Sequence, residues 1–79
     1  MPTVLRQGGF SVRIYPNDHD PPHVHVFKAG GEVKATIAES PALLDVINMS
    51  NKDVKKALEL IQNHRQELLE KWSDFYAND

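Results

Sequence analysis

The sequence contains no cysteine, which excludes a disulfide framework, a thiolate metal site and a cysteine nucleophile. Its apolar runs are short, whereas a helix that spans a membrane needs roughly 20 apolar residues. The first residues also lack the apolar segment of a secretory signal peptide. The net charge of -2 disfavours broad binding to a phosphate backbone. We therefore expect a cytoplasmic protein of one domain, residues 1–79, that is not associated with a membrane.

The first half of the chain, residues 1–38, has the pattern of a β-sheet. Apolar and polar residues alternate with the period of half-buried strands, and Gly8-Gly9 and Ala29-Gly30 are typical of hairpin turns. Prolines with Asn and Asp dominate positions 16–22 and interrupt the alternation. We predict about four antiparallel strands, at residues 4–6, 10–15, 23–28 and 32–38.

The second half of the chain has the pattern of a helix. Apolar residues recur at three- and four-residue steps after Ser50, and neither glycine nor proline follows. Ser50 and Asp53 stand at the spacing of an N-terminal capping box. We predict one long C-terminal helix over residues 50–77, unless it breaks near Asn63-His64. The connecting segment, residues 39–49, is either a short last strand or an apolar loop.

These elements predict an α+β fold, in which a small antiparallel β-meander packs against the long C-terminal helix. The helix is longer than any strand, so its end would overhang the sheet and expose Trp72, Phe75 and Tyr76. Such an apolar surface favours a protein partner or a homo-oligomer. The alternative is that these aromatic residues fold back onto the first strand or onto residues 39–49, with Trp72 as a packing residue.

Alternation along the strands separates the two faces of the sheet. A two-residue turn at Ala29-Gly30 would pair Val26 with Val33 and set His25 opposite Lys34, which gives two chemically consistent faces. The face that packs on the helix receives Val12, Ile14, Val24, Val26, Val33, Ala35 and Ile37. The open face receives Arg13, Tyr15, His23, His25, Phe27, Lys34 and Thr36.

His23 and His25 are the first candidates for a functional site, because side chains two positions apart on a strand point the same way. Two imidazoles in that arrangement can act as an acid/base pair or share a metal ion. Asp18 and His19 enter from the preceding loop and could orient a ring or supply further ligands. The commoner interpretation of such a pair is two amphipathic residues on an exposed strand.

Arg13 and Lys34 favour an anion over a cation beside the histidines, because their positive charges repel a metal ion. In a nuclease, His23 and His25 would be the catalytic acid/base groups, and Arg13 and Lys34 would stabilise a phosphate. No cofactor is expected for this chemistry. The commoner role of exposed Arg and Lys on a sheet face is to keep the protein soluble.

A divalent-metal site is the alternative to an anion site, and its ligands would be Asp18, His19, His23 and His25. Tyr15 and Arg65 are further candidate binding residues. Arg65 falls in the apolar stripe of the helix, where the commoner arrangement is a stem that lies along the core with the guanidinium in water.

Three segments carry a resemblance to a known family. They are Met-Pro-Thr-Val-Leu-Arg followed by Gly-Gly-Phe near the start, Tyr-Pro-Asn-Asp-His-Asp-Pro-Pro-His-Val-His-Val at residues 15–26, and Asn-His-Arg-Gln-Glu-Leu-Leu-Glu-Lys-Trp at residues 63–72. Over nearly its whole length the chain resembles the small bacterial proteins of domain of unknown function 4160. The family signature matches Tyr15, Asn17, Asp18, His19, Pro21, Pro22, His23 and His25. Asp20 stands where the family often has a small residue, which adds weight to metal binding.

The resemblance implies a role in a toxin–antitoxin-like gene pair, and hence a small protein partner encoded nearby. Three hypotheses follow. The first is a toxin–antitoxin-like component that binds its partner through the helix end and acts on RNA through its histidines. The second is a non-catalytic interaction module, such as an antitoxin or adaptor. The third is a divalent-metal-binding protein. The sequence leaves open whether the protein is an enzyme.

Overall fold

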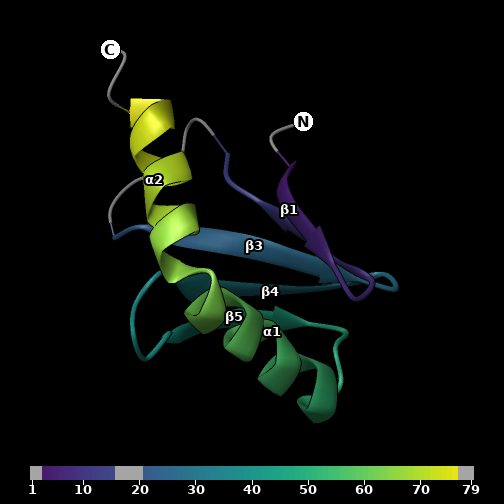
Figure 1. The fold of residues 1–79 in the computed structure, drawn as a ribbon. Helices are drawn as coiled ribbons and strands as arrows, with labels where there is room; N and C mark the ends of the chain where they lie inside the picture. The colour runs from purple at the N-terminus through teal and green to yellow at the C-terminus, as the bar shows by residue number, and fades with distance from the viewer. Residues whose placement is uncertain (1–2, 16–20, 77–79) are drawn as a thin grey trace.

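The computed structural model describes residues 3–15 and 21–76, and in these ranges the chain forms an α+β fold of five strands and two helices (Figure 1). The strands are β1 (Thr3–Gln7), β2 (Phe10–Arg13), β3 (His23–Lys28), β4 (Gly31–Thr36) and β5 (Leu43–Ile47). The helices are α1 (Asn51–Asn63) and α2 (Arg65–Tyr76). The predicted fold class is confirmed, whereas the numbers of strands and helices differ from the prediction.

The strands form one antiparallel sheet in the order β1-β2-β3-β4-β5, so each strand lies beside its neighbours in sequence. A tight turn joins β3 to β4, with φ of 48° at Ala29 and 83° at Gly30, and glycine adopts such a conformation at little cost. This turn sets Val26 opposite Val33 and His25 opposite Lys34. The predicted register is therefore confirmed.

The prediction of about four strands is wrong, because the connecting segment contains a fifth strand. β5 pairs with β4, and Asp45 lies opposite Lys34. The next pair joins Leu43 to Ala35, so Leu44 is an extra residue at a register shift. This shift explains why the apolar residues of β5 do not alternate with polar ones as they do in the other strands.

The prediction of one helix over residues 50–77 is also wrong, because the chain breaks at His64, near the position that the sequence left open. α1 begins at Ser50, whose hydroxyl accepts the Asp53 N–H at 3.2 Å and caps the helix. The Asp53 carboxylate lies 3.4 Å from the Lys28 ammonium, so it joins the helix start to the sheet. At His64, φ of -113° and ψ of 20° end α1.

The break directs α2 past the start of β3, where Trp72 lies against His23 (Figure 1). Trp72 is only 7% exposed, and its ring centre lies 5.3 Å from that of His23. Phe75 packs against the same core. The predicted overhang is therefore wrong for these two aromatic residues, and Trp72 is a packing residue. The side chain of Tyr76 lies outside the described part of the structure.

The core lies between one face of the sheet and the two helices. The seven residues predicted for the buried face are all at most 6% exposed, which confirms that prediction. α1 contributes Ala57, Leu60 and Ile61, and α2 contributes Leu68 and Trp72. α1 therefore covers this face of the sheet, whereas α2 adds Leu68 to its core and also reaches His23 at the start of β3 through Trp72. The functional side chains must be sought on the other face and at the edges.

Gly31 lies where the end of β5 passes close to the start of β4. A Cβ atom at Gly31 would lie 2.2 Å from the carbonyl oxygen of Asn48. Asn48 has a φ of 51°, and the chain turns there from β5 toward α1. Only glycine leaves room for this close approach of two backbone segments.

We predict that Gly31→Ala lowers the free energy of unfolding by about 1–3 kcal/mol, because backbone atoms and not a flexible side chain must move. Urea unfolding followed by circular dichroism measures the change. Gln66→Ala, at an exposed position of α2, is the control and should change the free energy by less than about 0.5 kcal/mol. An unchanged midpoint for Gly31→Ala would contradict the close approach.

Candidate functional site

A histidine–carboxylate pair lies on the open face of the sheet. His25 on β3 donates its Nδ1–H to the Glu32 carboxylate on β4 over 2.9 Å. The side chains are 12% and 30% exposed, so the pair is partly withdrawn from water. A carboxylate that binds one ring nitrogen orients the imidazole and fixes its tautomer, as in many acid/base and metal-ligand histidines.

Two aromatic rings flank His25. The ring centre of Tyr15 lies 4.7 Å away at an interplanar angle of 73°, and that of His23 lies 5.5 Å away at 65°. Both contacts are edge-to-face arrangements, which stabilise aromatic pairs. They hold the His25 ring in one orientation, and they place Tyr15 at the site for which the sequence proposed it.

His23 shares the face of His25 by register, yet it is not on an open surface. The residue is only 5% exposed, and Trp72 of α2 covers it. Its Nδ1–H donates to the carbonyl oxygen of Pro21 over 2.8 Å. The expectation that His23 and His25 lie together on an open face is therefore wrong for His23, because the sequence did not predict that α2 would turn over this end of β3.

A row of polar side chains crosses the open face through His25. Successive pairs of the register join Arg13 to His25, His25 to Lys34 and Lys34 to Asp45. The Arg13 guanidinium carbon lies 4.4 Å from the centre of the Phe27 ring, a cation–π contact. Arg13 Nε is buried without a hydrogen bond among the described residues. Arg13 and Lys34 thus stand on either side of His25, as predicted.

A small pocket of about 210 Å³ opens beside the pair. Its lining combines the pair with the last part of the polar row, and it consists of His25, Glu32, Lys34, Asp45 and Ile47. Sequence reasoning missed Glu32, although the predicted register placed it diagonally across from His25. It also missed Asp45, because a strand within residues 39–49 was only one of two alternatives and its register was not predicted.

Other predicted site residues lie elsewhere. Arg65, at the start of α2, has its guanidinium 3.7 Å from the Glu39 carboxylate, so its contact is with the segment after β4. Asp18 and His19 lie outside the described residues. Within residues 3–15 and 21–76, no three His, Asp or Glu side chains gather in a way that could hold a metal ion. The metal site that includes Asp18 and His19 stays a prediction.

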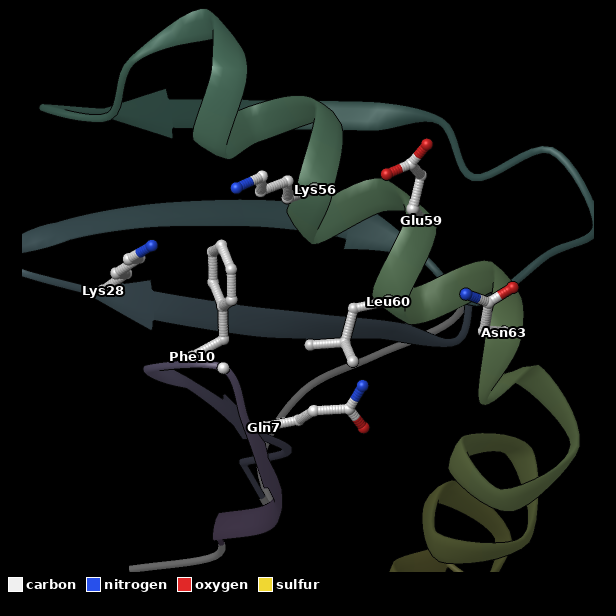
Figure 2. A pocket seen from close by; sticks show the side chains of 8 residues that line it. Gln7, Phe10, Lys28, Lys56, Glu59, Leu60 and Asn63 are labelled. Carbon is white, nitrogen blue, oxygen red and sulfur yellow. The ribbon is translucent and has the colours of Figure 1, made fainter.

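A second pocket, of about 290 Å³, lies between the β1–β2 turn and α1 (Figure 2). Phe10 and Leu60 form its apolar part, and Lys28 and Lys56 stand at its rim. The Lys28 ammonium lies 4.6 Å from the centre of the Phe10 ring and is also paired with Asp53. Lys28 therefore serves to join the sheet to α1, and the pocket is a less specific candidate than the face around His25.

The edge strand β5 carries the exposed apolar surface. Its four apolar side chains are between 37% and 53% exposed, and they are Leu43, Leu44, Val46 and Ile47. The large apolar residues of the other strands are buried or partly buried. An edge strand with this composition is a ready site for pairing with another chain. The sequence analysis predicted an exposed apolar surface at the end of the helix, whereas the structure has it on the edge strand β5.

The comparisons with known proteins give a family and no activity. A family model described as Domain of unknown function (DUF4160) matches residues 9–73, which include the His25–Glu32 pair and β5. No curated protein and no solved structure matches the chain. Neither helix of the described part has the length and apolar character needed to cross a membrane. The match spans most of the 79 residues, and the chain belongs to the family described as Domain of unknown function (DUF4160).

Proposed function

We propose that the protein is a partner-binding component of a toxin–antitoxin-like pair in the cytoplasm, and that β5 is the surface that binds the partner protein. The observation that carries this proposal is the exposure of Leu43, Leu44, Val46 and Ile47, at 37–53%. A protein of this size has little reason to leave four large apolar side chains together in water. Burial of such a patch in an interface would stabilise the complex.

The position of this patch favours binding through the sheet edge over binding through the helix end, which the first hypothesis used. The helix end is closed, since Trp72 is buried and Phe75 packs on the core. β5 in contrast is the last strand of the sheet, and no strand of residues 3–15 and 21–76 lies on its outer side. Backbone groups at a sheet edge are available to pair with an added strand, and alternate side chains supply selectivity.

Action on RNA is a second candidate function, and the His25–Glu32 contact of 2.9 Å favours it. An imidazole oriented by a carboxylate is suited to transfer protons to and from a ribose or phosphate oxygen. Lys34, which follows His25 in the polar row, would stabilise the developing negative charge. The burial of His23 leaves His25 as the acid/base group of this proposal. Without RNA cleavage, the protein is a non-catalytic module that uses the same β5 surface.

The partner proposal predicts that Leu44→Ser with Ile47→Ser weakens binding of the protein encoded by the neighbouring gene by at least about tenfold. Both proteins are co-expressed, and their affinity is measured by isothermal titration calorimetry. Gln66→Ser, which changes an exposed residue of α2, is the matched control and should bind as the original protein does. Equal affinity for the double variant, with unchanged circular dichroism, would rule out β5 as the contact surface.

The RNA proposal predicts that the purified protein cleaves RNA and that His25→Ala slows cleavage by about 10²–10⁴-fold, the usual contribution of an acid/base group. Glu32→Gln should have a smaller effect, because it keeps a side chain that can still accept the Nδ1–H. Gln66→Ala, at an exposed position of α2, is the control and should cleave RNA as the original protein does. If the original protein neither cleaves RNA nor arrests growth when expressed alone, the RNA proposal is wrong.

A further inference from the structure

One charged side chain interrupts the apolar surface of β5. Asp45 is the middle residue of the strand Leu43–Ile47, and this strand contains no basic residue. Asp45 lies opposite Lys34 and forms the outer end of the polar row that begins at Arg13. A strand added beside β5 would continue this row. The residue that it places beside Asp45 would therefore determine how stably it pairs with β5.

The Asp45 carboxylate also forms a hydrogen bond with the backbone of its own strand. Its Oδ1 accepts the Val46 N–H over 2.9 Å. One donor of the edge strand is therefore already engaged, and a charge stands beside it. Native proteins use charged side chains in this way to keep edge strands from pairing with the wrong chain. The Asp45 carboxylate and its negative charge would favour an added strand that places a cation or further hydrogen-bond donors beside Asp45.

The β5 strand of a second copy of the protein does not place a cation beside Asp45, because it contains no basic residue. On β5, Asp45 and Ile47 lie on the open face, whereas Val46 and Leu43 lie on the core face, because Leu44 is an extra residue at the register shift. If two β5 strands paired antiparallel with their core faces on the same side, opposite residues would come from the same face. Asp45 would then face the Asp45 or Ile47 of the second copy, and with inverted faces it would meet Leu43 or Val46. The first pairing sets two carboxylates roughly 5 Å apart, which is destabilising. The other pairings set a carboxylate against an apolar side chain.

We infer that β5 accepts an extended segment of a partner protein that carries Lys or Arg between apolar residues, and that Asp45 selects this segment against a second copy. The segment would add as a sixth strand beside β5. Its basic side chain would pair with Asp45, and its apolar side chains would cover Ile47 on the same face and Leu43 on the other face. This inference rests on the proposed function, because it specifies the partner of the same surface.

A charge-swap experiment uses a variant of the protein itself as the source of a strand with a basic residue between apolar residues. In the variant Asp45→Lys, the β5 strand carries a basic residue between the same apolar neighbours. The original protein alone and the variant alone should each be monomeric in sedimentation velocity, because like charges meet at the centre of the pair. An equimolar mixture at the same total concentration should associate about tenfold more tightly than either alone.

Further variants make the result specific. Asp45→Arg should behave as Asp45→Lys does and replaces it if the lysine variant does not fold. Asp45→Asn removes the repulsion and should self-associate more than the original protein. Gln66→Lys adds the same charge at an exposed site on α2, and its mixture with the original protein should stay monomeric.

Three results would overturn the inference. The first is a mixture that associates no more than its components do. The second is an original protein that already forms dimers which Leu44→Ser with Ile47→Ser abolishes. The third is equal association with Gln66→Lys. The natural partner takes no part in this experiment, so a failure of the charge swap is distinct from a failure of the proposed function. The proposed function fails when the protein encoded by the neighbouring gene binds the double variant of β5 as tightly as the original protein.

Discussion

The burial of one sheet face under two short helices is the constraint on which the rest of the structure depends. The central strands supply Val12, Val24, Val26 and Val33, all fully buried, and α1 and α2 together must cover them. A chain of 79 residues has few residues to spare for this purpose. The helices cover the middle of the sheet, and the edge strand β5 keeps its apolar side chains in water. The proposed binding surface is thus a consequence of how the core is closed.

The break at His64 determines the position of α2, and thereby the exposure of His23 and His25. His64 lies 3.0 Å from Gln7 of β1 and 3.3 Å from Glu67 of α2, measured between their side-chain atoms. These contacts tie the joint of the two helices to the sheet. Beyond the joint, Trp72 reaches His23 and buries it. Two histidines that the strand period makes equivalent therefore have different environments, and only His25 keeps its place on the open face.

Local patterns were sufficient to predict the features that depend on local rules. The register of β3 and β4 follows from the turn at Ala29, and the buried face follows from alternation. For the fifth strand these patterns left two alternatives, a short strand or an apolar loop, because the extra residue Leu44 disturbs its period. The burial of His23 depends on a contact between residues 49 positions apart in sequence, His23 and Trp72. No periodicity along the chain encodes such a contact, so the exposure predicted for His23 was wrong.

The open face and the edge strand are parts of one surface. Asp45 and Ile47 belong both to β5 and to the lining of the pocket beside His25 and Glu32. A strand that paired with β5 would lie along one wall of that pocket, since neighbouring strands are only about 4.8 Å apart. Its side chains would reduce the access of a large substrate to His25. Partner binding and any chemistry of the His25–Glu32 pair would therefore be coupled through shared residues, without a change in the fold.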